Sequence, residues 1–222
     1  MVRGLIFDVD GTLVSLKVDI EKLRSTTARE LVRMGFDTSF MDGGNLHTQE
    51  IIDRARQQVE SGRVKADFSA FRRALNGALD AIEMEWNALA EPIPGTSEVL
   101  ARLRDSNVRL ATLTNSGRRP SDWLLTRYDL LRYFDFTLTR DDVPALKPSP
   151  DGLRKAVELM GLPVDEVVYV GDSVIDVRAA RAAGVRVTSV TTGRYSPERL
   201  RTEGSQSVIG SLSELLDLVR RS

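Results

Sequence analysis

Short apolar segments alternate with helical patterns through the second half of the chain, and this alternation limits the fold more than any other feature. Apolar runs typical of buried strands occur at Val108–Leu113, Phe136–Leu138, Val167–Val170 and Val185–Val190. Between these runs, apolar residues recur at helical spacing, and the last helical segment follows a Ser-Leu-Ser-Glu sequence with the spacing of a capping box. The alternation predicts an α/β fold with a doubly wound, mainly parallel sheet.

The N-terminal part predicts one strand at Leu5–Phe7 and then, after Val14, a long stretch without strands. Apolar residues keep helical spacing there for about seventy residues, in three stripes separated by glycine-containing loops. A Pro-Ile-Pro-Gly sequence ends this stretch before the alternation begins. We therefore predict two domains: an α/β core of residues 1–14 and 89–222, and an all-helical bundle inserted at residues 15–88.

The composition excludes several kinds of site and partner. The 222 residues include no cysteine and one histidine, so thiolate and histidine-rich metal sites are excluded, and any metal should be a hard ion bound by oxygen. A net charge of −1 gives no electrostatic drive toward nucleic acid or an anionic membrane. No segment is long and apolar enough to span a bilayer, and because the first strand begins so close to Met1 we expect no signal peptide. The absence of cysteine is compatible with a reducing compartment, so we expect a cytoplasmic protein.

Two acids follow the first strand. Asp8 and Asp10 come directly after the apolar run, and Gly11 then allows a sharp turn. Open α/β sheets bind ligands at the carboxyl ends of their strands, so both carboxylates are expected at a ligand site. Acids so close together repel each other, which favours a nearby cation such as Mg²⁺ with a phosphoryl group. A polar turn without function explains this segment equally well when it is taken alone.

Two later segments offer groups that bind phosphate. Thr114 and Asn115 follow a predicted strand and supply a hydroxyl and an amide, although this composition is also common in ordinary loops. Lys147 precedes Pro148, which restricts the lysine to an extended conformation in which its ammonium group can face an anionic site. A lysine in such a sequence is more often a solvated surface residue.

A second pair of acids follows the strand at Val167–Val170. Asp172 and Asp176 are four residues apart, so they share one face if Asp176 lies in the first turn of a helix. Acids at a helix N-terminus also stabilise the helix dipole, and this structural role predicts the same residues. In a parallel sheet the carboxyl ends of the strands share one edge, so acids from the first strand and from this strand can hold a Mg²⁺ between them.

The order of these motifs resembles that of the haloacid dehalogenase superfamily, in the branch that includes phosphoglycolate phosphatases and β-phosphoglucomutases. The resemblance covers the α/β core and implies a Rossmann-like fold with a helical cap. The four matching motifs are Asp8-Val9-Asp10-Gly11-Thr12, Thr114-Asn115, Lys147-Pro148, and Gly171-Asp172 with Asp176.

The resemblance implies a catalytic role for four of these residues. Asp8 would be the nucleophile that forms an aspartyl-phosphate, and Asp10 would be the general acid and then the general base. Thr114 and Lys147 would stabilise the phosphoryl oxygens, and Lys147 would also orient Asp8. Relatives that cleave carbon–halogen bonds carry no acid at the position of Asp10, so its presence favours a phosphatase or a phosphomutase.

The resemblance also implies a Mg²⁺ site and a set of substrate contacts. The predicted metal site comprises Asp8 and Asp172 through their carboxylates, Asp10 through its backbone carbonyl, and Asp176 in the second shell or through water. The predicted phosphate- or substrate-binding residues are Gly11, Thr12, Asn115, Ser116 and His47.

The helical insert lies where this branch carries its cap. The segment 42–47 is polar and glycine-rich, and it resembles the cap's specificity loop in position. We expect this loop to reach the active site and His47 to contact the substrate. The alternative is that His47 only begins a helix or lies on the surface.

The motifs predict a Mg²⁺-dependent phosphatase that hydrolyses a small phosphate monoester, such as phosphoglycolate or a sugar phosphate. A phosphomutase of the β-phosphoglucomutase type shares every core residue and stays open as an alternative. A non-catalytic phospho-acceptor or binding domain is disfavoured, because such domains lack the Asp-x-Asp-Gly-Thr motif and the helical insert. The expected partner is a small phosphorylated metabolite; the sequence specifies neither which one nor the oligomeric state.

Overall fold

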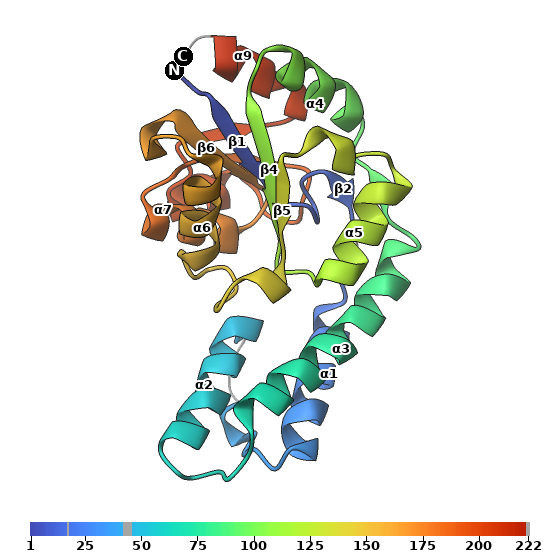
Figure 1. Cartoon of the computed structure of the whole chain (residues 1–222), viewed down its shortest axis with the longest axis vertical. Coiled ribbons are helices and arrows are strands. Elements are labelled where there is room, and N and C mark those ends of the chain that lie inside the picture. Colours follow the sequence, from blue (N-terminus) through green and yellow to red (C-terminus); the bar gives the residue numbers. More distant parts are fainter. Residues whose placement is uncertain (17, 42–45, 221–222) are drawn as a thin grey trace. The chain divides into compact units, whose positions relative to one another are not determined.

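The computed structural model describes residues 1–16, 18–41 and 46–220, and the chain divides into two compact units. The core unit is Met1–Leu16 with Leu89–Ser222, and the helical unit is Lys17–Ala88. Figure 1 shows the strands of the sheet gathered in the core unit. The predicted domain roles, catalytic core and cap, stay predictions.

The core unit is built on a six-stranded sheet with the order β5-β4-β1-β6-β7-β8, in which every pair of neighbours is parallel. This arrangement confirms the predicted doubly wound α/β fold. The first strand, β1, lies in the middle between β4 and β6, so its carboxyl end is at the centre of the sheet edge. The strands are β1 Gly4–Phe7, β4 Arg109–Leu113, β5 Phe136–Leu138, β6 Val167–Gly171, β7 Arg186–Val190 and β8 Ser207–Ile209.

Helices pack on both faces of this sheet (Figure 1). On one face, Leu5 and Phe7 of β1 join a buried cluster that includes Leu100 of α4, Leu124 of α5 and Leu215 of α9. On the other face, α6 contacts β4, and α7 contacts β6 and β7. The helices of the core unit are α4 Thr96–Asp105, α5 Arg118–Arg127, α6 Asp151–Met160, α7 Val174–Ala183, α8 Pro197–Glu203 and α9 Leu215–Arg220.

The helical unit contains α1 Ile20–Arg33, α2 Thr48–Glu60 and α3 Phe68–Asn87, and its described residues include no strand. Two aspartates begin helices there, because the Asp19 carboxylate accepts a hydrogen bond from the backbone N of Lys22 and the Asp67 carboxylate accepts one from the backbone N of Ser69. Residues from all three predicted apolar stripes form the buried interior of this unit, whereas Ile20 at the start of the first stripe is 46% exposed. The unit's buried apolar residues include Leu31, Ile51, Ile52, Ala55, Phe71, Leu75 and Leu79.

A two-stranded antiparallel ladder lies where the chain leaves and re-enters the core unit, and the sequence analysis did not predict it. β2 (Val14–Ser15) pairs with β3 (Glu91–Pro92), and the backbone N of Ile93 donates to the carbonyl of Leu13 at 2.9 Å. Because of this ladder, the core unit extends to residue 16 rather than ending at residue 14. Two-residue strands are too short to produce a periodic pattern.

Three further local predictions were wrong or incomplete. The sequence Ser149-Pro150 predicts a helix with serine as its N-cap and proline at its first position, but α6 begins at Asp151; the Ser149 hydroxyl still accepts a 3.4 Å hydrogen bond from the Asp151 backbone N. The leucines at 124–125 and 130–131 suggest one helix, but α5 ends at Arg127, because Asp129 adopts φ +55° and Leu131–Tyr133 form a separate 3-10 turn. Helix α8 and strand β8 were not predicted, since both are too short for a periodicity argument.

Candidate active site

The turn after β1 places two carboxylates at the centre of the sheet edge. The backbone N of Asp8 continues the ladder by donating to the carbonyl of Val170 at 2.8 Å, and Val9 is buried in the core cluster. Gly11 adopts φ +84°, a conformation that other residues rarely reach, and its backbone N donates to Val14 at 2.7 Å. A Cβ at Gly11 would lie 2.6 Å from the Asp172 carboxylate, so glycine is needed here for close packing as well as for the turn.

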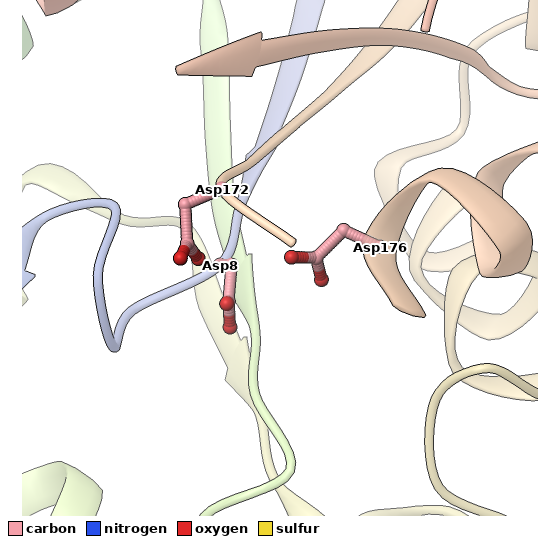
Figure 2. Close-up of side chains that lie close together, drawn as sticks. All are labelled: Asp8, Asp172 and Asp176. Atoms are coloured by element: carbon pink, nitrogen blue, oxygen red, sulfur yellow. The ribbon is translucent and has the colours of Figure 1, made fainter. Parts of the chain in front are cut away.

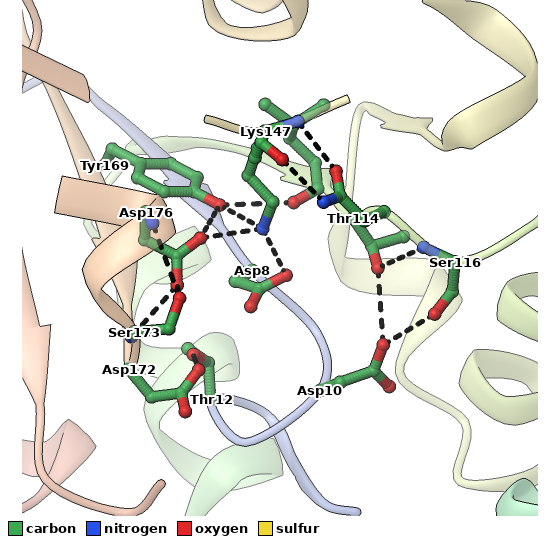
Figure 3. A network of polar contacts seen from close by, with 12 residues as sticks. Asp8, Asp10, Thr12, Thr114, Ser116, Lys147, Tyr169, Asp172, Ser173 and Asp176 are labelled. Carbon is green, nitrogen blue, oxygen red and sulfur yellow. Dashed lines mark hydrogen bonds and ion pairs between the residues drawn. The ribbon is translucent and has the colours of Figure 1, made fainter. Parts of the chain in front are cut away.

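Lys147 is the cation at the centre of the site (Figure 3). Its Nζ lies 2.7 Å from Oδ1 of Asp8, 2.7 Å from Oδ1 of Asp176 and 2.8 Å from the Tyr169 hydroxyl. Although burial opposes its charge, the Asp176 and Asp8 carboxylates raise the pKa of Lys147 above its usual value, so the ammonium stays charged. Lys147 is only 4 % exposed, which excludes the surface role that its sequence context alone favoured.

The amide of Asn115 holds the backbone of Lys147. Asn115 Nδ2 donates to the carbonyl of Lys147 at 3.0 Å, and the backbone N of Lys147 donates to Asn115 Oδ1 at 2.9 Å. Both polar atoms of the side chain are therefore engaged by the lysine. This geometry gives Asn115 a different contact from the predicted one with phosphate.

Asp176 performs the helix-capping role and the site role together, one with each oxygen. Its Oδ2 accepts hydrogen bonds from the backbone N of Ser173 at 3.0 Å and from the Ser173 hydroxyl, which completes a capping box at the start of α7. Its Oδ1 accepts from Lys147 and, at 3.0 Å, from the Tyr169 hydroxyl. The two explanations that the sequence left open are thus compatible.

Three acidic side chains converge from β1, the end of β6 and the start of α7 (Figure 2). Asp8, Asp172 and Asp176 each offer a carboxylate oxygen within 4.8 Å of the others, and all three are buried. Among the residues that the structure describes, no lysine, arginine or histidine nitrogen forms an ion pair with Asp172; its one side-chain contact is the Thr12 hydroxyl at 3.4 Å. A buried carboxylate without a cation is costly, so this group of oxygen ligands fits a hard divalent ion.

Burial strongly affects the protonation of these acids. Burial, together with the nearby Asp176 carboxylate, raises the pKa of Asp172 to about 7. Burial also raises the pKa of Asp8 well above its usual range; the ammonium of Lys147 opposes this shift, while the acids around Asp8 add to it. A bound divalent cation would stabilise the ionised forms of these carboxyls.

Asp10 points away from this cluster toward the segment after β4 (Figure 3). Its Oδ2 accepts hydrogen bonds from the Ser116 hydroxyl at 2.7 Å and from the Thr114 hydroxyl at 3.4 Å, and the Ser116 backbone N donates to Thr114 Oγ1 at 3.0 Å. Burial raises the pKa of the Asp10 carboxyl, an effect that the Ser116 hydrogen bond partly offsets. Because its carboxylate lies outside the group of three metal-competent acids, any metal contact of Asp10 would use its backbone carbonyl.

The structure brings most of the predicted site residues together at one sheet edge. The residues gathered there are Asp8, Asp10, Gly11, Thr12, Thr114, Asn115, Ser116, Lys147, Asp172 and Asp176. His47 is the N-cap residue of α2 in the helical unit, where its backbone N donates a hydrogen bond to the Glu50 carboxylate at 2.7 Å. Residues 42–45 of the predicted specificity loop lie outside the described residues, so substrate contact by this loop stays a prediction.

Sequence analysis missed three residues that support the site. Tyr169 was treated as part of an apolar strand, and its hydroxyl contacts both Lys147 and Asp176. In the loop after β7, the Thr192 hydroxyl donates to the carbonyl of Gly11 at 2.6 Å, and a Cβ at Gly193 would lie 1.8 Å from Asp172. The loop after β7 could have been identified from the sequence, because ligands of open α/β sheets bind at the carboxyl ends of the strands and β7 is one of these strands.

Sequence and structure comparisons find proteins similar to this chain along most of its length. A sequence model of the haloacid dehalogenase-like hydrolase family matches residues 5–190. A plasmid-encoded phosphoglycolate phosphatase of Cupriavidus necator is 30% identical over 96% of this chain and 90% of its own length. A phosphoglycolate phosphatase of Pseudomonas aeruginosa is 31% identical over 96% of this chain and 78% of its own length. A solved haloacid dehalogenase-like hydrolase structure from Bacteroides fragilis is 25% identical, with a TM-score of 0.69 over 97% of this chain and 100% of that one.

Proposed function

Because the chain belongs to the haloacid dehalogenase-like hydrolase family, we propose that it is a phosphatase that hydrolyses a small phosphate monoester through an aspartyl-phosphate on Asp8. The observation that carries this proposal is the division of work between the two acids after β1. Lys147 holds Asp8 within the acidic cluster, whereas Ser116 and Thr114 hold Asp10 outside it. This division supports the proposal that one carboxylate attacks phosphorus and the other moves protons.

Asp8 is suited to be the nucleophile. Its Oδ1 faces the ammonium of Lys147, and among the described residues its Oδ2 has no hydrogen-bond partner. Lys147 therefore fixes the direction of the carboxylate and supplies a positive charge beside the phosphoryl group during transfer. Phosphoryl transfer depends mainly on such positioning and charge neutralisation.

Asp10 is suited to be the general acid and base. Burial raises its pKa, which favours the protonated carboxyl that can give a proton to the leaving alkoxide. After the alcohol leaves, the carboxylate can accept a proton from the attacking water. The Ser116 and Thr114 hydroxyls keep the carboxyl oriented in both steps.

We propose that Asp8, Asp172 and the backbone carbonyl of Asp10 hold a Mg²⁺, which when bound would neutralise phosphoryl charge. Asp176 would act through water and through Lys147, because its two oxygens already accept hydrogen bonds from Lys147, Tyr169 and Ser173. Among the described residues, Asp8, Asp172 and Asp176 are buried around one ammonium, that of Lys147, and this local excess of carboxylates supports the site.

A phosphorylated metabolite such as phosphoglycolate is the proposed substrate class, by likeness to relatives described as phosphoglycolate phosphatases. We also propose that the helical unit acts as the cap and sets the choice among substrates. His47→Ala should then change the order of preference among phosphorylated metabolites more than it changes hydrolysis of p-nitrophenyl phosphate. Equal losses on all substrates would contradict a specificity role for His47.

The test of the proposed function is hydrolysis of p-nitrophenyl phosphate with Mg²⁺ by the wild type, by Asp8→Asn and by Asp105→Asn. Asp105 is an exposed acid at the C-terminus of α4, so its variant controls for the loss of one carboxylate. We expect Asp8→Asn to lose activity and Asp105→Asn to keep it. Full activity of Asp8→Asn would refute the mechanism. Measuring inorganic phosphate release beside sugar-phosphate isomerisation separates a phosphatase from a phosphomutase.

A further inference from the structure

Tyr169 is a polar side chain in an otherwise apolar central strand. It lies in β6 in register with Ile6 of β1, and Val168 and Val170 on either side of it point into the core cluster on the opposite face. The side chain is completely buried. Its hydroxyl therefore has to find hydrogen-bond partners within the protein, and it finds them in the catalytic cluster (Figure 3).

The hydrogen bonds around this hydroxyl complete those of Lys147. An ammonium group has three N–H donors, and Lys147 Nζ has three acceptors: Asp8, Asp176 and the Tyr169 oxygen. The single phenolic proton of Tyr169 is then directed to Oδ1 of Asp176 at 3.0 Å or to the carbonyl of Leu113 at 3.3 Å. Each donor of the buried lysine is matched to one acceptor.

We propose that Tyr169 is a positioning residue that fixes the Lys147 ammonium so that one N–H points at Asp8. With the two carboxylates as its only acceptors, the buried ammonium would keep one N–H without a partner, and it could turn about its bond to the carbon chain to share its donors between them. A third acceptor from a different direction stops this rotation. The inference rests on the proposed function, since it concerns the same nucleophile.

The competing explanation is that the hydroxyl only satisfies buried polar groups and stabilises the fold. The two explanations differ in what removal of the oxygen changes. A structural role lowers the free energy of unfolding and leaves turnover by the folded protein unchanged. If Tyr169 positions Lys147, removing its hydroxyl lowers kcat, and it does so only in a protein that still carries Lys147.

The experiment compares Tyr169→Phe with Tyr133→Phe, whose hydroxyl accepts a hydrogen bond from Arg132 at the surface. With p-nitrophenyl phosphate and saturating Mg²⁺, we expect Tyr169→Phe to lower kcat by about tenfold, as is reasonable when a charged donor loses its acceptor. The Kd for Mg²⁺ should change little, because Tyr169 does not contact Asp172, and Tyr133→Phe should match the wild type in both. An unchanged kcat in Tyr169→Phe would overturn the proposal.

A double-mutant cycle tests whether Tyr169 acts through Lys147. Beryllofluoride serves as a phosphoryl analogue, and its adduct with Asp8 is measured by ¹⁹F NMR in wild type, Tyr169→Phe, Lys147→Met and the double variant. Tyr169→Phe should weaken the adduct by about tenfold when Lys147 is present and have little further effect in the Lys147→Met background. Equal weakening in both backgrounds would overturn the proposal. Asp8→Asn is measured in parallel, so that loss of its activity supports the proposed function whatever the outcome for Tyr169.

Discussion

Asp172→Asn should make the metal-free protein more stable, and the gain should grow with pH. In the folded protein, burial and the Asp176 carboxylate raise the pKa of Asp172 from 3.8 to about 7. A folded-state pKa above the unfolded one means that the folded protein binds more protons between these values, so stability falls as the pH rises through this window. Asparagine keeps the shape of the side chain and removes the titration.

The size of the effect follows from the shift. A difference of about three pKa units, at about 1.4 kcal/mol each, gives an upper limit of about 4 kcal/mol for the cost of ionising Asp172. Linkage places that cost at about 2 kcal/mol at pH 5 and about 4 kcal/mol at pH 8. The gap in stability between Asp172→Asn and the wild type should therefore widen by about 2.5 kcal/mol over this range.

Urea unfolding in EDTA at several pH values measures this gap. The chain has two tryptophans, Trp86 in α3 of the helical unit and Trp123 in α5 of the core unit. A Trp86→Phe background leaves Trp123 as the only tryptophan, so fluorescence excited selectively at tryptophan reports the core unit. Mg²⁺ should narrow the gap, because it stabilises only the protein that keeps Asp172. A gap that stays constant from pH 5 to 8, or that narrows, would refute the electrostatic reasoning.

Three further predictions concern the supports of the site. Gly193→Ala would place a Cβ 1.8 Å from Asp172, so Mg²⁺ titration should show a Kd raised by about tenfold or more, whereas Gly77→Ala, with open space around its Cβ, should leave it unchanged. As the pH falls below 7, the Kd for Mg²⁺ should rise by up to about tenfold per pH unit, because binding must displace a proton from Asp172. Titration calorimetry at several pH values measures this Kd, and a Kd that does not change with pH would contradict the prediction. Asn115→Ala removes two hydrogen bonds to the backbone of Lys147, so the free energy of unfolding in urea should fall by about 1–3 kcal/mol and kcat should fall as well. A loss of stability with unchanged kcat would contradict the idea that Asn115 supports the lysine.

The residues that the structure brings together as the sequence predicted are those whose positions follow from local sequence. Asp8 and Asp10 directly follow a buried strand, and Asp172 follows another, so the rule that strand ends share an edge brings them together without knowledge of packing. The capping position of Asp176 is equally local. Burial of Lys147 is different, because its sequence context alone favoured the surface, and only the family resemblance indicated otherwise.

The residues that were missed act through tertiary contacts. In a strand pattern Tyr169 looks the same as any aromatic core residue. Its contact with the site depends on the position of the Lys147 ammonium, which the sequence does not show. Gly193 belongs to a loop of ordinary composition, and its importance is visible only from the space left beside Asp172. Phosphate binding by Asn115 stays a prediction; what the sequence did not indicate is that its amide bonds the backbone of Lys147.

The central claim is that Asp8 carries the phosphoryl group. Acid quenching of the reaction with p-nitrophenyl phosphate, followed by borohydride reduction and peptide mass spectrometry, locates an acyl phosphate by converting the aspartate to homoserine. Asp10→Asn should accumulate this species, because p-nitrophenolate leaves without a proton while the hydrolytic water lacks its base. Homoserine at Asp8 in both proteins is the predicted result. A phosphoryl group on any other residue, or turnover without an acyl phosphate in either protein, would contradict the account.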